Sequence, residues 1–251
     1  MITIGWLSAI LFGLMVSIGG MNGVRSFLSL FLNFLMLFFT IILITGGFPP
    51  VAVTLINGII ILAITIFLGD DNTQVTETAF YASLIVLIIL VLLIIPVEHL
   101  AAVQGFGAED SEEIEAFSLL VGANFMQIAI STAIFSTLGA IAEGAIAISA
   151  GLNEIVEQTP TIDLKKLYAA GISIGKHIIG TTFNTLFFGF FGGFLALFIL
   201  LVQTHATFAD IINDKIFVAE LIMILFSIIG VILAVPITAW VLIQKLKKEN
   251  N

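Results

Sequence analysis

Two ionisable residues, Glu143 and His177, stand out in the middle of an otherwise apolar sequence. A charged side chain in the centre of a bilayer costs about 2.5–3.5 kcal/mol on insertion scales, so such groups usually face a partner or a watery path. An imidazole titrates near neutral pH and can relay protons. Each residue also has a plainer interpretation. Glu143 lies at the inner membrane interface if a span ends near Ala142. His177 lies at the edge of a lysine-bearing helix face, where a solvated interfacial histidine is expected. Both interpretations stay open.

Uncharged polar residues accompany this pair, with Ser149 and Asn153 after Glu143 and Asn184 after His177. One hypothesis is that these five residues line a polar path near the inner leaflet. The alternative is structural, because polar side chains in membrane helices form interhelical hydrogen bonds of about 0.6–2 kcal/mol. Such bonds would account, without any transport, for the amides within or beside the apolar stretches: Asn33, Asn57, Asn124, Gln127 and Asn184.

An enzyme is not expected. The run Gly171-Ile172-Ser173-Ile174-Gly175 matches the nucleophile-elbow pattern, but an elbow needs a strand-turn-helix context that this sequence does not offer. Glycines spaced four apart let membrane helices approach closely. Gly171 with Gly175 and Gly189 with Gly193 have this spacing, and Gly139 and Gly144 lie in a stretch rich in Gly, Ala and Ser. We therefore assign a helix-packing role to all six glycines. The histidines lack metal-ligand spacing, and we expect neither a metal nor a cofactor.

The composition indicates a membrane protein that is all-α. Of 251 residues, 60% are hydrophobic and 10% are charged, and the mean hydropathy is +1.22. A soluble domain carries about 25% charged residues. The few charges of this chain cannot cover a water-exposed surface, so most of its surface is expected to face lipid. The net charge of −9 comes mostly from short loops. A basic patch is missing, which argues against nucleic acid, and the absence of cysteine excludes disulfides and thiolate chemistry.

The apolar stretches predict a polytopic bundle of about seven spans, since about 20 apolar residues cross a bilayer. They run over Ile2–Ile18, Phe27–Thr45, Val51–Leu68, Phe80–Val97, Leu119–Ala142, Asn184–Val202 and Ile216–Ile243. Lysine and arginine favour the cytoplasmic side. With the N-terminus outside and the C-terminus inside, only Lys215 of the eight basic residues falls outside. The whole chain, 1–251, forms one multi-span membrane domain in this interpretation.

Two segments do not fit a simple alternation of spans and loops. Leu138 to Asn153 is rich in Gly, Ala and Ser, and it is either one long tilted helix or a helix that breaks near Gly139 or Gly144. Leu164 to Phe183 places its lysines, Ser173 and His177 on one side and its apolar residues on the other. This pattern predicts an amphipathic helix on the inner membrane face, with lysines toward anionic headgroups.

Two motifs resemble the YibE/F family of bacterial multi-pass membrane proteins. The first is Gly-Ala-Ile-Ala-Glu-Gly-Ala-Ile-Ala-Ile-Ser over 139–149, continued by Asn153-Glu154. The second is Gly-Lys-His-Ile-Ile-Gly-Thr over 175–181 with Asn184-Thr185-Leu186. The resemblance is clearest over residues 116–202. It implies a bacterial cell membrane location and a short type of chain, because larger members carry an extracytoplasmic domain before the spans.

The resemblance also implies candidate partners: a longer YibE/F-type membrane protein or a second copy of the chain. Where the family tends to have Asp, this chain has Glu143 in the first motif and His177 in the second. The first exchange keeps a carboxylate, whereas the second does not. If the mechanism needs two carboxylates, the second one would therefore have to come from a partner protein. The leading functional hypothesis is a transporter or permease subunit of unknown substrate, and the alternative is a non-transporting scaffold that stabilises a partner membrane protein.

Overall fold

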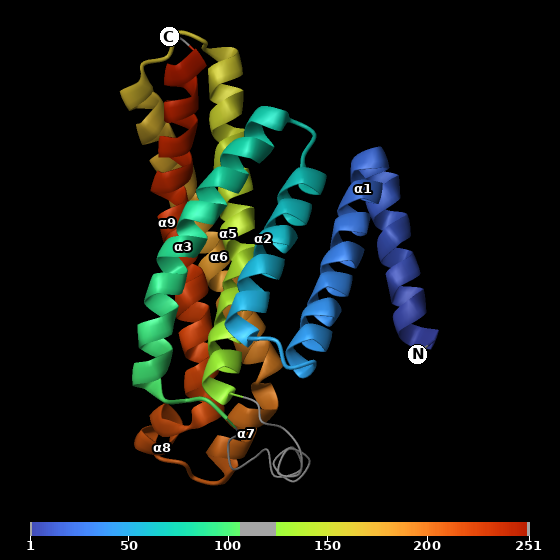
Figure 1. Ribbon diagram of the computed structural model, residues 1–251, viewed down its shortest axis with the longest axis vertical. Coiled ribbons are helices and arrows are strands. Elements are labelled where there is room, and N and C mark those ends of the chain that lie inside the picture. The colour runs from blue at the N-terminus through green and yellow to red at the C-terminus, as the bar shows by residue number, and fades with distance from the viewer. Residues whose placement is uncertain (1, 106–123, 250–251) are drawn as a thin grey trace.

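The computed structural model describes residues 2–105 and 124–249, and all regular elements within these ranges are helices (Figure 1). They are α1 (Ile2–Thr45), α2 (Pro50–Gly69), α3 (Thr73–Ala101), α5 (Phe125–Gln158), α6 (Leu164–Gly193), α7 (Leu195–Gln203), α8 (Phe208–Asn213) and α9 (Lys215–Glu249). The all-α expectation is confirmed.

Local sequence signals set several helix starts. Pro50 opens α2 at a position where a missing N–H is harmless. The Asn72 side chain accepts hydrogen bonds from the backbone N–H groups of Gln74 and Val75 and so caps α3. Asn124 caps α5 in the same way, which gives this amide a local structural role.

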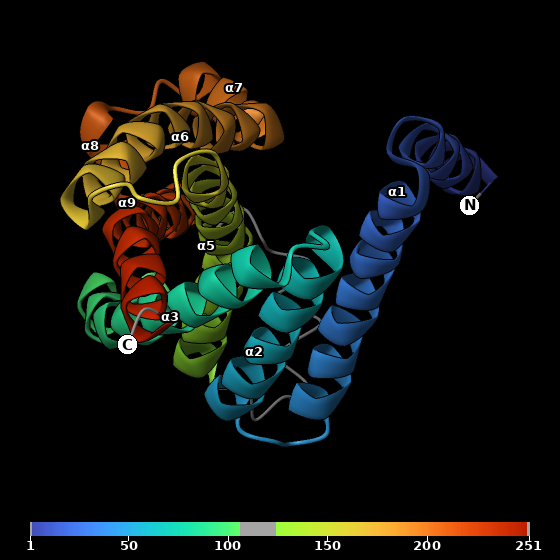
Figure 2. The same ribbon diagram turned by 90° about the horizontal axis from the view of Figure 1, so that it is seen from above.

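Helix α5 lies in the middle of the bundle, with α2, α3, α6 and α9 packed around it (Figure 2). The larger core cluster joins α2, α3, α5 and α9 through side chains such as Leu62, Leu90, Ile134 and Phe226. A second cluster joins α5, α6 and α9 near the other end of α5, through residues that include Leu152, Leu167 and Leu242.

Helix α1 is folded back on itself at Gly20, whose φ of 54° and ψ of −128° are not helical. A positive φ of this kind favours glycine. The two arms lie beside each other (Figures 1 and 2), with the rings of Phe12 and Phe27 4.8 Å apart and Gly23 against the backbone of Met15. The first arm is exposed along most of its length, as expected for a lipid-facing helix.

Five of the described helices are long and apolar enough to cross a membrane, or six if α6 and α7, bent by 58°, form one broken span. This count treats α1 as one helix, although Gly20 divides it. The α2–α3 turn, the α5–α6 turn and the C-terminus share one end of the bundle (Figure 1). Ion pairs at that end join Arg25 to Asp71 and Lys245 to Glu77. Seven spans and an outside N-terminus remain predictions.

The structure decides between the two interpretations of the small-residue segment. Helix α5 runs without a break from Phe125 to Gln158, so neither Gly139 nor Gly144 interrupts it. The first residues of the expected fifth span, 119–123, lie outside the described residues.

The expected surface helix has different bounds. Leu164 to Phe183 is the first part of a helix that continues to Gly193 and lies against α9 and α5. The physical reason is its apolar side, where Leu167, Gly171 and Gly175 are buried by the bundle.

Candidate functional site

The five residues of the expected polar path fall on different sides of the bundle. Ser149 is fully buried, and its hydroxyl donates to the Val75 carbonyl of α3 at 3.0 Å. Asn153 is also buried, and its amide donates to the Glu157 carboxylate at 2.7 Å. Glu143, His177 and Asn184 are exposed instead. The structure therefore separates two structural hydrogen-bonding residues from three exposed ones.

Of the exposed residues, His177 lies near the contact between α5 and α6. Ile174 of α6 packs on Gly151 of α5, with its Cδ1 3.0 Å from the position that a Cβ of Gly151 would take. His177 follows Ile174 at i+3, so it lies on the same side of α6. Glu143 precedes Gly151 by eight residues, which places it about 80° away around the axis of α5. Among the described residues, neither Glu143 nor His177 forms an ion pair.

The glycines also divide into two groups. Gly144, Gly171 and Gly175 meet α9 or α5 side chains, and a Cβ on Gly175 would overlap Val235. Other glycines of the described residues that contact a neighbouring helix closely, such as Gly58, Gly151 and Gly230, were not singled out from the sequence. By contrast, a Cβ would meet open space at Gly139, Gly189 and Gly193.

A polar stripe follows the exposed side of α5. Thr132, Ser136, Gly139 and Glu143 are exposed and succeed one another at steps of four, three and four residues, which is one face of a helix. We call these four residues the α5 stripe. The stripe starts near the N-terminal end of α5 and runs toward the middle of that helix. A central helix of a membrane bundle thus presents polar and small groups on its open side.

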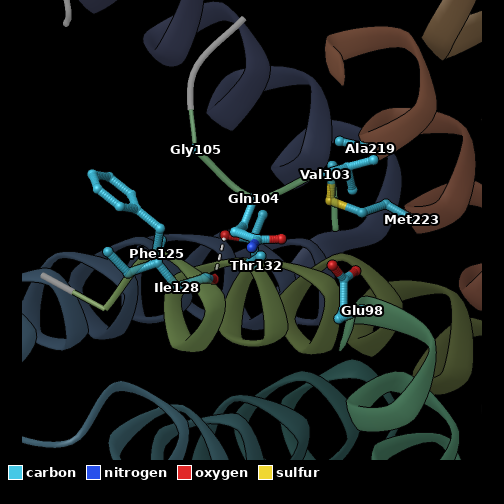
Figure 3. A pocket seen from close by; sticks show the side chains of 10 residues that line it. Glu98, Val103, Gln104, Gly105, Phe125, Ile128, Thr132, Ala219 and Met223 are labelled. Carbon is cyan, nitrogen blue, oxygen red and sulfur yellow. Dashed lines mark hydrogen bonds between the residues drawn. The ribbon is translucent and has the colours of Figure 1, made fainter. Parts of the chain in front are cut away.

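At the start of the stripe lies a cavity of about 340 Å³ that contains a buried carboxylate, and we call it the Glu98 cavity. Glu98 is 4% exposed and has no ion-pair partner within residues 2–105 and 124–249. Ala102, in the left-handed conformation, ends α3 and turns the chain so that Val103 and Gln104 fold over the cavity. Figure 3 shows the side chains of Glu98, Gln104, Thr132 and Met223 among those that line this cavity.

Two further cavities continue from the Glu98 cavity along α5. The Thr40 cavity, of about 400 Å³, lies between α1 and α5 and shares Ile128 and Thr132 with the Glu98 cavity. The Asn33 cavity, of about 230 Å³, shares Leu37 and Phe135 with the Thr40 cavity. Its far end is lined by Gly139, one helical turn from Glu143.

Each of these cavities is lined by a residue with a buried polar atom that the protein leaves without a hydrogen bond. The atoms are Gln104 Oε1 in the Glu98 cavity, Ser131 Oγ in the Thr40 cavity and Asn33 Oδ1 in the Asn33 cavity. The Asn33 amide nitrogen is occupied, since it donates to Thr65 Oγ1 at 2.8 Å. Buried polar groups are normally paired, so these atoms call for water or a ligand.

Sequence reasoning missed Glu98. The apolar stretch was expected to end at Val97, which placed Glu98 in a loop, but α3 continues through Pro96 to Ala101. A proline in a helix usually signals an end or a kink. The usable signal was Glu98 itself, a carboxylate directly after a long apolar run. Nothing in the sequence distinguishes Ser131 or Gln104 from other polar residues.

The cavities of this arrangement can hold water or bind a small molecule. Ser173 lies inside the continuous helix α6, not at a strand-to-helix turn. In the described part of the chain, no three His, Asp or Glu side chains come together as metal ligands would. The cavities combine one carboxylate with scattered hydroxyl and amide groups on mostly apolar walls, as in sites that bind small molecules.

Comparison with known proteins gives one match. The family model described as YibE/F-like protein matches residues 7–248, which covers nearly the whole sequence. No curated protein and no solved structure matches the chain. The long apolar helices and this match make the chain a membrane protein, and it belongs to the YibE/F-like family.

Proposed function

We propose that the protein is a transport or permease subunit in which a hydrated route follows α5. The observation that carries this proposal is the row of three adjoining cavities from Glu98 to Gly139, each with an unpaired buried polar atom on its wall. Leaving a buried polar group unpaired costs about 1–3 kcal/mol. Water in the cavities would supply the missing hydrogen bonds of all three atoms.

The cavity volumes agree with hydration. A water molecule occupies about 30 Å³ of liquid volume, and the smallest of the three cavities has a volume of about 230 Å³. Each cavity therefore has room for several waters. Beyond Gly139 the α5 stripe continues to Glu143, which extends the polar line past the last cavity.

The open side of the stripe suggests that the route is completed by another protein. Glu143 is exposed at the end of the α5 stripe, while other sides of α5 are packed against α2, α3, α6 and α9. In a bilayer an exposed carboxylate is costly unless water or a partner meets it. A longer family member or a second copy would cover this side. We place the complex in the bacterial cytoplasmic membrane, with the end that holds Arg25 and Lys245 inside.

A non-transporting scaffold is the alternative, and the same exposed side favours it. Glu143 and Gly139 offer a partner helix a hydrogen-bonding group and a close-approach point, respectively. In that case the stripe is a dry contact in the assembled complex. The two functions differ in whether water reaches the middle of α5.

Single cysteines test this difference, because the chain has none of its own. The probes are Thr132→Cys, Gly139→Cys and Ala147→Cys, which follow α5 from the Glu98 cavity to beyond Glu143. Ile88, 62% exposed on α3, supplies a lipid-facing control, and Ala142, 1% exposed, supplies a control within the protein core. Each variant is treated in native membranes with a membrane-impermeant thiol reagent from one side and then from the other.

We expect Thr132→Cys and Gly139→Cys to react from the side that holds the Glu98 cavity, while both controls stay unreactive. Reaction of Ala147→Cys from that side as well would show that water passes Glu143. If none of the three probes reacts from either side, the transport proposal is abandoned for the scaffold.

A further inference from the structure

We propose that the Glu98 cavity binds a small organic ammonium ion, with Glu98 as its counter-ion. Glu98 is only 4% exposed, and it lines a cavity of about 340 Å³. It has no salt bridge within the described ranges. A buried carboxylate is strongly disfavoured unless a cation or hydrogen-bond donors accompany it. A ligand that carries its own positive charge and N–H donors supplies both.

The surrounding polar atoms fit an ammonium group. Gln104 Oε1 is buried without a hydrogen bond and belongs to the same cavity. Thr132 adds a hydroxyl on the α5 side. An ammonium group has three donors and no acceptor, and these three groups offer three acceptors. A divalent metal fits less well, because the described residues bring no cluster of three metal-ligating side chains together.

Cavity size and wall chemistry point to an organic ion instead of a bare monovalent ion. The volume of about 340 Å³ lies within the range of about 300–1,000 Å³ typical of small-molecule sites. Most of the wall is apolar and includes Val103, Ala129, Ala219 and Met223. An alkyl substituent of a few carbons covers this surface, and its charged end reaches Glu98.

A small organic ammonium ion would then be the class of substrate that enters the hydrated route along α5 at the Glu98 cavity. Only the transport step after binding rests on the proposed function. Binding is therefore measured separately from transport. The probe is n-butylammonium, with butan-1-ol as an uncharged molecule of similar shape. The full chain is placed in nanodiscs of zwitterionic phosphatidylcholine at pH 7, and binding is followed by ligand-observed NMR and calorimetry.

Three variants isolate the site. Glu98→Gln keeps the side-chain shape and removes the charge, and Ala219→Leu fills the cavity while Glu98 remains. Glu220→Gln is the matched control, since Glu220 neighbours Ala219 on α9 but does not line the cavity. A hydrogen bond to a charged group is worth enough that Glu98→Gln should weaken butylammonium binding by about tenfold or more. Ala219→Leu should weaken it as well, and Glu220→Gln should leave it unchanged.

The inference is overturned if the wild-type protein does not bind butylammonium, binds butan-1-ol equally well, or keeps its affinity in Glu98→Gln. Uptake of labelled butylammonium into proteoliposomes is then measured with the same variants. Binding without uptake would leave this site standing and count against transport. Thiol labelling along α5 with no ammonium binding would leave the route standing and remove Glu98 as its cation site.

Discussion

The contact of α6 with α9 at Gly175 offers a sharp test of the structure. A Cβ added at Gly175 would overlap Cγ1 of Val235 and lie 2.9 Å from its Cβ. Valine in a helix has one strongly preferred rotamer, so its side chain cannot turn away. Gly180 is on the same helix, but a Cβ there meets nothing within 4 Å. Alanine substitutions at these two glycines should therefore have opposite effects on stability.

The magnitudes follow from two competing terms. Overpacking costs about 1–3 kcal/mol, and we take the upper end because the clash involves a stiff side chain and its Cβ. Replacing a helical glycine by alanine returns about 1 kcal/mol. Gly175→Ala should then lose about 2 kcal/mol of unfolding free energy, whereas Gly180→Ala should gain up to about 1 kcal/mol.

The assay is equilibrium unfolding in mixed micelles with increasing denaturing detergent, followed by circular dichroism. Val235→Ala alone and together with Gly175→Ala completes a double-mutant cycle. Truncating Val235 makes room for a methyl group on α6. The double variant should therefore lose less unfolding free energy than the two single variants lose together, by about 1 kcal/mol or more. Equal stability of Gly175→Ala and Gly180→Ala, or strict additivity in the cycle, would refute the close approach of α6 and α9.

Two further predictions concern hydrogen bonds. Ser149→Ala removes the hydrogen bond from α5 to α3 and should reduce the unfolding free energy in the same micelle assay by about 0.5–1.5 kcal/mol. Ser136→Ala, at an exposed serine, is the control, and equal effects of the two substitutions would contradict the assignment. The Thr207 hydroxyl, followed by the Thr207 backbone N–H, holds the pKa of exposed Asp210 below its usual value of 3.8. Thr207 and Asp210 cap the start of α8 through these hydrogen bonds. Since the pKa of Asp210 is lower in the folded than in the unfolded state, the cap stabilises α8 above about pH 4, and this stabilisation is lost as the pH falls through the folded-state pKa. Hydrogen exchange of the Thr207 amide, corrected for its intrinsic rate, should show protection that is lost only below about pH 4, and the amide should be unprotected in Asp210→Ala. Protection that stays unchanged down to pH 2 would disprove this role of Asp210.

Helix positions were largely predictable, because hydropathy and turn residues act locally. Val51–Leu68 was expected and Pro50–Gly69 is observed, with proline at the start and Asp70 after the end. The expected stretch Phe80–Val97 lies inside α3, which extends beyond it at both ends. The extensions carry polar residues that hydropathy alone assigns to loops. One of them is Glu98, so the boundary error concealed the residue on which the Glu98 cavity depends.

The candidate site was less predictable, because it depends on which side of each helix meets a neighbour. Glu143 and Ser149 are close in sequence, yet one is exposed and the other is buried against α3. The rotation of α5 within the bundle decides this difference. The same holds for glycine, since Gly175 is in close contact and Gly189 is in open space, although both belong to Gly-x-x-x-Gly pairs.

An all-helical membrane protein could be predicted from hydropathy alone, because each helix satisfies its own backbone hydrogen bonds and its length must match the bilayer. The sequence also indicated the family, through two motifs that the match over residues 7–248 agrees with. The positions of the cavities depend on how the helices pack, since each cavity has walls from at least two helices that are distant in sequence. Unpaired atoms such as Gln104 Oε1 and Asn33 Oδ1 are likewise a property of packing, because a hydrogen-bond partner is present or missing only once the helices have met.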